Sequence, residues 1–213
     1  MKKGMFITLE GGEGAGKSTL AQTLTTFLQA KDIGVMLTRE PGGTKEAEAI
    51  RSLVVSGDKD RFDPITESLL FNAARRHHLT HSILPALESG TWVICDRFVD
   101  STLVYQGYVQ GVDIDFLKKL HHDVCEDVFP DLTLLLEVPV DIGLYRAHRR
   151  QHNISETRFE QKGHEFHETV RSAFLELAQQ HTDRYCVLDG TLSENDLTQA
   201  AMKYINSLLQ QHN

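Results

Sequence analysis

The sequence predicts an α/β protein of three layers, in which a five-stranded parallel sheet carries helices on both faces. Short, nearly all-apolar runs alternate along the chain with longer segments of helical periodicity, as in repeated strand–helix–strand units. The first apolar run, residues 5–9, leads straight into a glycine-rich turn and then a helix. A length of 213 residues suits one large domain with a small lid, but hardly two domains. We therefore expect a single domain over residues 1–213.

Composition and charge exclude several classes of protein. Hydrophobic residues make up 40% and charged residues 24% of the chain, and no stretch approaches the roughly 20 apolar residues of a membrane span. The apolar run near the N-terminus ends at Glu10, too early for a signal peptide. A net charge of −8 argues against a nucleic-acid binder, because phosphate backbones are held by basic surfaces. We expect a soluble, cytoplasmic protein that binds neither membrane nor nucleic acid.

The stretch from Gly11 to Ser18 fits the pattern of a phosphate-binding loop, with a glycine, four residues and then Gly-Lys-Ser. Glycines can adopt positive φ, which lets successive backbone N–H groups converge on an anion. The ammonium of Lys17 can reach the β- and γ-phosphates, and the hydroxyl of Ser18 can ligate Mg²⁺. A turn that binds nothing is the alternative, but the loop lies between a predicted strand and a predicted helix, the context that such a loop requires. The loop alone thus indicates a nucleoside triphosphate with Mg²⁺.

The next elements continue the strand and helix order. Apolar residues at helical spacing predict a helix that ends near residues 31–34, and residues 35–38 predict a second strand. The charged, Pro/Gly-rich loop over 39–44 follows the carboxyl end of that strand, where open α/β sheets bind ligands. An ordinary connection is the alternative for this loop. A helix over 44–57 comes next.

A long helix is predicted over residues 64–89, with an apolar face and a kink at Pro85. Phe71 and Arg75 lie four residues apart and therefore on one side of it. Such a pair could stack a flat base and hold a phosphate, although helix packing is its commoner use. We interpret the nearby histidines as a solvated helix face rather than as metal ligands: His77, His78 and His81.

Two further strands are predicted over residues 91–96 and 131–138. The first of these ends at Asp96, where a carboxylate often holds Mg²⁺, directly or through water, beside a phosphate loop. Residues 98–107 are mixed polar and aromatic and again follow a strand's carboxyl end, so they could hydrogen-bond a ligand. Taken alone, Tyr105 could equally belong to the core.

The remaining elements alternate in the same way around one basic segment. They are a helix over 113–128, a helix from Pro139, a helix marked by Phe166 to Leu177, a strand over 185–189 and a helix over 194–209. Arg146, Arg149, Arg150 and Arg158 bracket a polar stretch in an otherwise acidic chain. A closing lid can bring an arginine to a transferring phosphoryl group and exclude water. We therefore prefer a lid over residues 147–158 to a solvated charged run.

Taken in order, the motifs resemble those of the thymidylate kinase family over essentially the whole chain. Residues 6–19 resemble its first strand and phosphate loop, residues 38–44 match its Thr-Arg-Glu-Pro-Gly-Gly-Thr motif, and residues 96–106 resemble its Asp-Arg-Tyr segment. Each motif is short, but their order and spacing are highly specific. The resemblance implies a P-loop kinase fold, a homodimer, and transfer of the γ-phosphoryl group of MgATP to dTMP, giving dTDP and ADP in dTTP synthesis.

The resemblance also implies a dTMP site. Phe71 would stack on the thymine, while Thr102 and Gln106 would hydrogen-bond the base. Arg75 and Arg97 would hold the phosphate by charge-assisted contacts. The other residues assigned to this site are Glu13 at the sugar 3′-hydroxyl, Tyr105 crowding the 2′ position, Arg39 and Ser101.

On the donor side, the resemblance assigns ATP and Mg²⁺ to the phosphate loop. The nucleotide-binding residues are Gly11, Gly12, Glu13, Gly14, Ala15, Gly16, Lys17, Ser18, Thr19 and Arg146. Ser18 and Asp96 are the metal-holding residues. The residues assigned to catalysis are Lys17, Arg97, Arg149 and Arg150. Some members carry an arginine where this chain has Gly14, so here that arginine is expected to come from the lid.

Three positions depart from the family pattern, and two rival functions stay open. Phe98 replaces a tyrosine, Glu137 an aspartate common at that strand end, and Thr157 an aspartate frequent before Arg158. One rival is a kinase of the same fold that acts on dCMP or a nucleoside. The other is a nucleotide-binding switch whose arginine loop contacts a protein partner.

Overall fold

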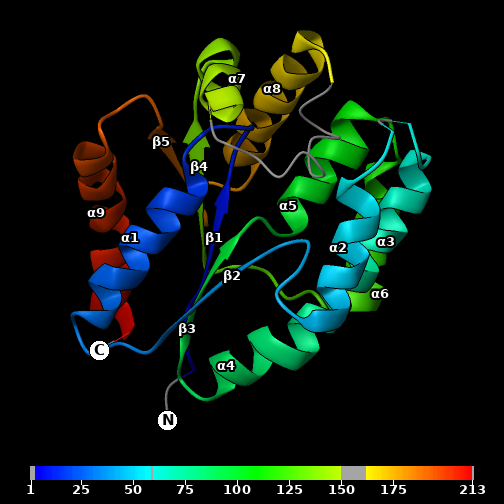
Figure 1. Ribbon diagram of the computed structural model, residues 1–213. Coiled ribbons are helices and arrows are strands. Elements are labelled where there is room, and N and C mark those ends of the chain that lie inside the picture. Colours follow the sequence, from blue (N-terminus) through cyan, green and yellow to red (C-terminus); the bar gives the residue numbers. More distant parts are fainter. Residues whose placement is uncertain (1–2, 59, 150–161, 213) are drawn as a thin grey trace.

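A parallel five-stranded sheet lies at the centre of the computed structural model, which describes residues 3–58, 60–149 and 162–212 (Figure 1). The strands are β1 (Phe6–Glu10), β2 (Val35–Arg39), β3 (Trp92–Asp96), β4 (Leu132–Glu137) and β5 (Tyr185–Asp189). Their order across the sheet is β2-β3-β1-β4-β5. Each predicted strand is present, and the predicted parallel α/β sheet is confirmed. Because every pairing is parallel, the carboxyl ends of all the strands lie at one edge.

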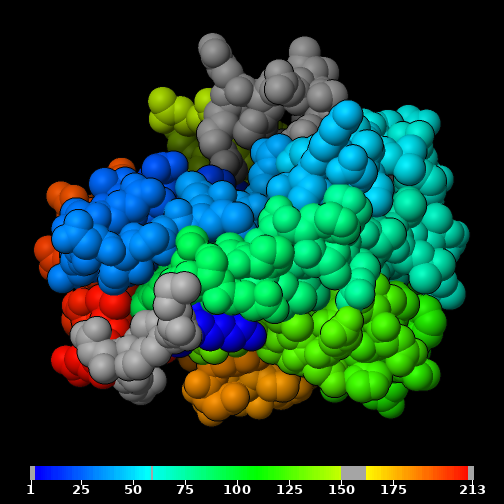
Figure 2. All heavy atoms as spheres, turned by 90° about the horizontal axis from the view of Figure 1, so that it is seen from below, coloured from blue at the N-terminus to red at the C-terminus, as the bar shows by residue number. Residues whose placement is uncertain are grey.

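Helices cover both faces of this sheet. The helical elements are α1 (Lys17–Gln29), α2 (Lys45–Val55), α3 (Pro64–His78), η1 (Leu79–Ile83), α4 (Leu84–Glu88), α5 (Val99–Thr102), η2 (Leu103–Val109), α6 (Ile114–Cys125), α7 (Val140–Arg149), α8 (His164–Gln180) and α9 (Glu194–His212). Seen from below, the blue α1 and the red α9 lie together on one side, and the cyan-to-green segments of α2 to α6 lie on the other (Figure 2). No helix of the described residues is both long and apolar enough to cross a membrane.

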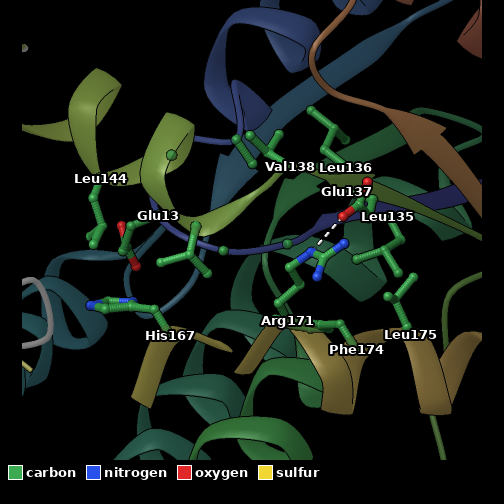
Figure 3. Close-up of a pocket in the computed structure, with 15 residues that line it drawn as sticks. Glu13, Leu135, Leu136, Glu137, Val138, Leu144, His167, Arg171, Phe174 and Leu175 are labelled. Carbon is green, nitrogen blue, oxygen red and sulfur yellow. Dashed lines mark hydrogen bonds and ion pairs between the residues drawn. The ribbon is translucent and has the colours of Figure 1, made fainter. Parts of the chain in front are cut away.

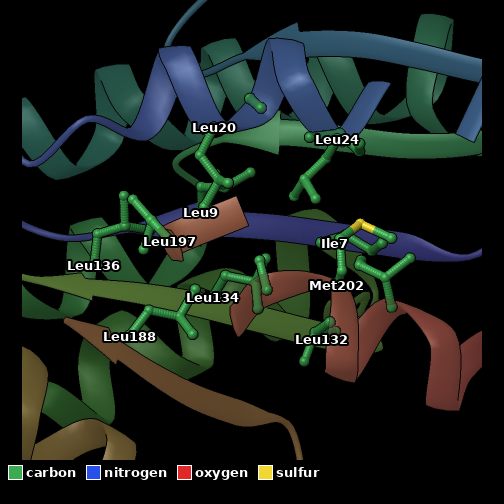
Figure 4. Packing of buried hydrophobic residues seen from close by; sticks show 14 of the residues in the cluster. Ile7, Leu9, Leu20, Leu24, Leu132, Leu134, Leu136, Leu188, Leu197 and Met202 are labelled. Atoms are coloured by element: carbon green, nitrogen blue, oxygen red, sulfur yellow. The ribbon is translucent and has the colours of Figure 1, made fainter. Parts of the chain in front are cut away.

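The largest core cluster fills the face between the sheet, α1 and α9 (Figure 4). Successive side chains of a strand point to opposite faces, so Ile7 and Leu9 of β1 both lie in this cluster. They pack there with Leu20 and Leu24 of α1 and with Met202 of α9. This packing holds α1, and therefore the loop that precedes it, against the end of β1.

The alternate residues of β1 face the other layer and become polar toward the carboxyl end of the strand. Phe6 packs edge-on against Phe98, with ring centroids 4.9 Å apart. The Thr8 hydroxyl lies 3.0 Å from the hydroxyl of Thr133 on β4. Glu10, the last residue of the strand, is fully buried. The interior thus changes from apolar to polar at the edge where the phosphate loop begins.

Two segments differ from the predicted helices. The long helix over 64–89 is interrupted by the π-helical turn η1 just before Pro85, which stands in the first turn of α4, where its missing N–H breaks no helical hydrogen bond. Residues 99–109, which the sequence predicts only as a ligand-facing segment, form α5 and η2. Their buried side chains include Thr102 and Gln106, so the segment lacks the apolar periodicity that identifies most helices.

The prediction of a solvated histidine face is wrong for His78. Its side chain is fully buried, whereas His77 is partly exposed and His81 is exposed. The helix turns one histidine toward the sheet and the others away from it, and the sequence pattern shows no difference between them. The free thiols of Cys95 and Cys125 are also buried.

Candidate active site

The phosphate-binding loop connects β1 to α1 and uses the conformations that only glycine adopts freely. Gly11, Gly14 and Gly16 have φ values of 136°, 67° and 97°, in the region where a Cβ is strained. The ammonium of Lys17 folds back over the loop and donates to the carbonyls of Gly11 at 3.1 Å and Gly12 at 2.8 Å. Burial lowers the pKa of Lys17 to about 8. The loop thus has the predicted positive-φ glycines, and the Lys17 ammonium lies over it.

Two glycines let the loop rest directly on α7. A Cβ at Gly14 would come within 1.9 Å of the Gly143 carbonyl oxygen, and a Cβ at Gly143 within 2.5 Å of the Glu13 carbonyl oxygen. Both contacts involve backbone atoms, which cannot move aside as a flexible side chain can. An arginine at position 14 would therefore require α7 to pack farther from the loop.

Ser18 and Asp96 meet at the same edge of the sheet. The Ser18 hydroxyl donates to Asp96 Oδ2 over 2.7 Å, and this bond is exposed to solvent. The pair brings the first residues of α1 to the end of β3, as the sequence predicts. Among the described residues, no group of three or more His, Cys, Asp or Glu side chains is arranged to hold a metal ion. Any metal at this edge would take its protein ligands from the hydroxyl and carboxylate oxygens of this pair.

Arg97 joins the phosphate loop to the predicted acceptor site. Its Nη1 donates to the Gly11 carbonyl and to Ser101 Oγ, both at 3.1 Å, and its Nη2 donates to Glu13 Oε1 at 3.0 Å. The guanidinium lies 5.3 Å from the centroid of the Tyr105 ring, and the Tyr105 hydroxyl is 3.4 Å from Glu13 Oε1. The backbone of Arg97 has a φ of 72°, which is uncommon outside glycine. The structure thus brings together four residues predicted separately.

Glu10 is a site residue that the sequence analysis missed. It accepts hydrogen bonds from the Phe98 N–H at 2.8 Å and from the Ser101 hydroxyl at 2.6 Å. Burial, with a further contribution from Asp100, raises the pKa of Glu10 to about 7. The chain Glu10–Ser101–Arg97 therefore holds the arginine from the side opposite Glu13. A carboxylate that closes an apolar strand directly before the loop was the signal available in the sequence.

Arg75 forms a second, more deeply buried arginine group. Its side chain is only 3% exposed, and its Nε donates to Glu40 Oε2 over 2.7 Å. Its Nη2 donates to Thr102 Oγ1 at 3.0 Å and to the Phe98 carbonyl at 3.2 Å. Burial disfavours the charge, but Glu40 outweighs it and the pKa of Arg75 is raised. Thr102, predicted at the base, accepts a hydrogen bond from this arginine, and Glu40 was not predicted as a site residue.

The other predicted acceptor residues lie on α2, α3 and η2 or beside them. Phe71 is partly buried on α3, one turn before Arg75. Gln106 is buried, and its Nε2 donates to Glu67 Oε2 at 3.1 Å. Arg39 is half-exposed and pairs with Glu48 of α2 at 3.1 Å. The structure thus joins Gln106 to a carboxylate that the sequence analysis overlooked and turns Arg39 toward α2.

Of the predicted lid arginines, the structure describes two. Arg146 Nη1 donates to the Gly190 carbonyl at 2.7 Å, and a Cβ at Gly190 would lie 3.3 Å from the Ala15 carbonyl oxygen. Arg146 is thus tied to a segment beside the phosphate loop. Arg149 is exposed and lies 5.6 Å from the centroid of the Tyr145 ring. Arg150 and most of the predicted lid over 147–158 lie outside the described residues.

A small cavity of about 30 Å³ lies behind the phosphate loop (Figure 3), with room for about one water molecule. Glu137 and Arg171 form an ion pair of 2.5 Å in its wall. Glu137, one of the departures from the family pattern, therefore has a structural partner on α8. The cavity is too small for a nucleotide. The candidate site is the edge around Lys17 and Arg97, which both donate to the Gly11 carbonyl.

Comparisons with known proteins agree on one family. The family model described as thymidylate kinase matches residues 9–201. The chain is 51% identical to a thymidylate kinase of Magnetococcus marinus over 88% of this chain and 89% of that protein, and 41% identical to one of Halalkalibacterium halodurans over 98% and 99%. A crystal structure of thymidylate kinase from Ehrlichia chaffeensis has a TM-score of 0.76 and 33% identity, covering 95% of this chain and 99% of that one. The chain belongs to the thymidylate kinase family.

Proposed function

We propose that this thymidylate kinase transfers the γ-phosphoryl group of ATP to dTMP in line, with the two nucleotides bound on either side of Arg97. One observation carries the proposal: Arg97 contacts both the phosphate loop, at the Gly11 carbonyl and at Glu13, and the hydroxyl of Ser101 in the acceptor segment. Donor and acceptor sites therefore share one guanidinium at one edge of the sheet. Such a group can neutralise charge that develops between the two phosphates in the transition state.

The protein's contribution is positioning and charge rather than covalent chemistry. Phosphoryl transfer passes through a state with charge spread over the equatorial oxygens, and no covalent intermediate with the enzyme is needed. Lys17 would leave the loop carbonyls for the β- and γ-phosphates, which the backbone N–H groups of residues 11–18 cradle. Arg97 supplies a second positive charge from the acceptor side. Arg146 and Arg149 of α7 are the described candidates for a third, replacing the arginine that Gly14 excludes.

Ser18 and Asp96 would hold Mg²⁺. Hard cations prefer oxygen ligands, and these two side chains present a hydroxyl and a carboxylate 2.7 Å apart at the solvent-exposed edge. When bound, Mg²⁺ would neutralise charge on the phosphates of ATP. The role of the protein is to keep Ser18 oriented through its hydrogen bond to Asp96.

The acceptor site lies along α3, α5 and η2. Phe71 would stack on thymine and Gln106 would hydrogen-bond the base, held in place by Glu67. Arg75 would bind the dTMP phosphate together with Arg97. The remaining assigned residues are Glu13 at the 3′-hydroxyl, Tyr105 at the 2′ position, Thr102, Ser101 and Arg39. Burial raises the pKa of Tyr105, so its hydroxyl stays neutral and crowds the ribose position without adding charge.

A coupled ADP-release assay with dTMP, dUMP, dCMP and dGMP tests this function. With ATP and Mg²⁺, we expect turnover with dTMP to exceed that with dCMP or dGMP by at least about two orders of magnitude, because their different hydrogen-bonding edges would leave buried Gln106 unpaired. Preference for another acceptor would identify a different kinase of the same fold. ATP hydrolysis that no acceptor stimulates would indicate a nucleotide-binding switch.

We further propose a homodimer formed through α3 and α6. Ile65 and Leu69 on α3 are 53% and 49% exposed, and Phe116 on α6 is 40% exposed. A groove between the two helices is lined in part by Leu69, Leu120 and Val124. Contiguous exposed apolar surface of this kind favours a protein partner, and a second copy of the chain is the partner that the family resemblance implies.

Size-exclusion chromatography with light scattering tests the dimer. We expect twice the chain mass for the wild type and the single-chain mass for Leu69→Arg, which places a charge in the centre of the proposed interface. Leu192→Arg is the matched control, since Leu192 is also exposed, at 40%, but follows β5. A monomeric wild type, or equal dissociation by both variants, would contradict the proposed interface. The single-domain organisation and the cytoplasmic location stay predictions from the sequence.

A further inference from the structure

His78 occupies a position in the fold that suggests a role in the reaction. It ends α3, its side chain is fully buried, and both ring nitrogens have partners. Nδ1 lies 3.2 Å from Glu40 Oε1, and Nε2 lies 2.8 Å from the hydroxyl of Thr38 on β2. Because an ionised carboxylate can only accept hydrogen bonds, Nδ1 carries the proton that it shares with Glu40.

Glu40 is shared between this ring and the buried arginine. Its Oε1 faces His78, and its Oε2 accepts from Arg75 Nε at 2.7 Å. Arg75 and His78 are three residues apart on α3 and so lie on the same side of the helix. Glu40, in the loop after β2, therefore has each of its oxygens held by a different residue of one helix.

The hydrogen bonds that Arg75 makes leave the Nη1 edge of its guanidinium available to a ligand. Nε is bound to Glu40, and Nη2 is bound to Thr102 and to the Phe98 carbonyl. Nη1 has only a long 3.5 Å contact with Asn72 Oδ1 among the described residues. The direction of Nη1 is thus set by Glu40 at Nε together with Thr102 and the Phe98 carbonyl at Nη2.

The loop after β2 locks the His78 ring in place. A Cβ at Gly43, which has a φ of 84°, would come within 2.2 Å of His78 Nε2 and 2.6 Å of Thr38 Oγ1. Close backbone approach on that side leaves the ring no room to turn. The ring is therefore held between Thr38, which contacts Nε2, and Glu40, which contacts Nδ1.

We propose that His78 is a positioning residue for the acceptor phosphate: it fixes Glu40, which aims Arg75 at the phosphate of dTMP. This inference rests on the proposed role of Arg75 in binding that phosphate. Without the bond from Nδ1, Oε1 of Glu40 loses its partner in a buried site. The carboxylate then rotates to regain one and carries Arg75 with it, which weakens dTMP binding and leaves the ATP side unaffected.

Substitution of His78 by asparagine or by glutamine distinguishes this positioning role from simple core packing. The Nδ2 of asparagine can occupy the place of His78 Nδ1, so His78→Asn keeps a donor for Glu40. The terminal amide of glutamine reaches the place of Nε2, so His78→Gln keeps the Thr38 contact and loses that donor. Both variants lose the ring, and both are expected to lower the thermal midpoint by comparable amounts.

The measurement is kcat and KM for dTMP and for ATP in the full chain. We expect His78→Gln to raise the KM for dTMP about tenfold, as loss of one hydrogen bond to a charged group requires. The KM for ATP should change less than about twofold, and His78→Asn should recover most of the dTMP affinity. Equal KM values for dTMP in the two folded variants would overturn the inference.

Arg75→Lys distinguishes failure of this inference from failure of the proposed function. If Arg75→Lys raises the KM for dTMP and His78→Gln does not, only the positioning role of His78 is wrong. If Arg75→Lys has no effect, the phosphate role of Arg75 is wrong and the inference falls with it. Should His78→Gln fail to fold, His78→Leu replaces it: this variant fills the buried space without a donor for Glu40, and an unchanged KM for dTMP would then count against the inference.

Discussion

Lys17→Ala is expected to lower kcat by about three orders of magnitude, the scale of losing one preorganised charged group at a transition state. The ammonium lies over the phosphate loop, and among the described residues it donates to the carbonyls of Gly11 and Gly12. These neutral contacts can be exchanged for a phosphate without breaking an ion pair. Its pKa, lowered by burial to about 8, still leaves most of the group charged at pH 7, and phosphate binding would raise that fraction further.

Steady-state and single-turnover rates with saturating dTMP and MgATP measure this effect. Lys119→Ala is the control, because Lys119 is exposed on α6 and pairs with Asp123 at the surface. Its kcat should match that of the wild type. Turnover of Lys17→Ala within about tenfold of the wild type would show that the loop lysine does not carry the transferring charge.

Arg97→Ala is expected to lower kcat/KM for dTMP by about three orders of magnitude and to lower kcat as well. The guanidinium contacts the phosphate loop, Ser101 and Glu13 at once. Its removal takes away a positive charge, and Glu13 loses the cation that it is paired with. Both ground-state binding of the acceptor and charge neutralisation in the transition state should therefore suffer.

Arg97→Gly provides a control for the backbone. Glycine and alanine remove the same guanidinium, but only glycine adopts a φ of 72° without strain. The two variants should lose activity equally, and Arg97→Gly should be more stable to unfolding than Arg97→Ala by about 1 kcal/mol. Kinetics and denaturant unfolding measured on the same preparations would check this. Activity that follows stability across the two variants would mean that Arg97 acts through the fold alone.

The strained backbone at Arg97 has a clear origin in the sheet. β3 ends at Asp96, which bonds Ser18, and the next residue must turn back over the loop after β1. Glu10, at the end of β1, accepts the N–H of Phe98 and stabilises that turn. The ends of two adjacent strands therefore bring the Glu10 carboxylate and the Arg97 guanidinium together through the Ser101 hydroxyl. This arrangement depends on β1 and β3 being neighbours in the sheet.

Local sequence patterns were enough to predict the secondary-structure elements and the position of the phosphate loop. Strands, helices and glycine turns depend on side-chain periodicity and on backbone preferences over a few residues, so the strand positions and the parallel sheet were predicted correctly. The motifs from Gly11 to Ser18 and from Asp96 to Gln106 predict a site at one edge of the sheet, and the structure brings the two segments together at that edge. The secondary structure predicted from local patterns is correct except in the helix around η1 and over residues 99–109.

The pairing of the charged side chains, in contrast, depends on tertiary contacts. Glu40 holds Arg75 across 35 residues and Glu13 holds Arg97 across 84, and nothing in either local sequence distinguishes these carboxylates from solvated ones. The same holds for His78, which differs from His77 only in the direction that the helix turns it. A side chain's burial and its partners depend on which elements pack against it, and the chain brings those elements together from distant positions.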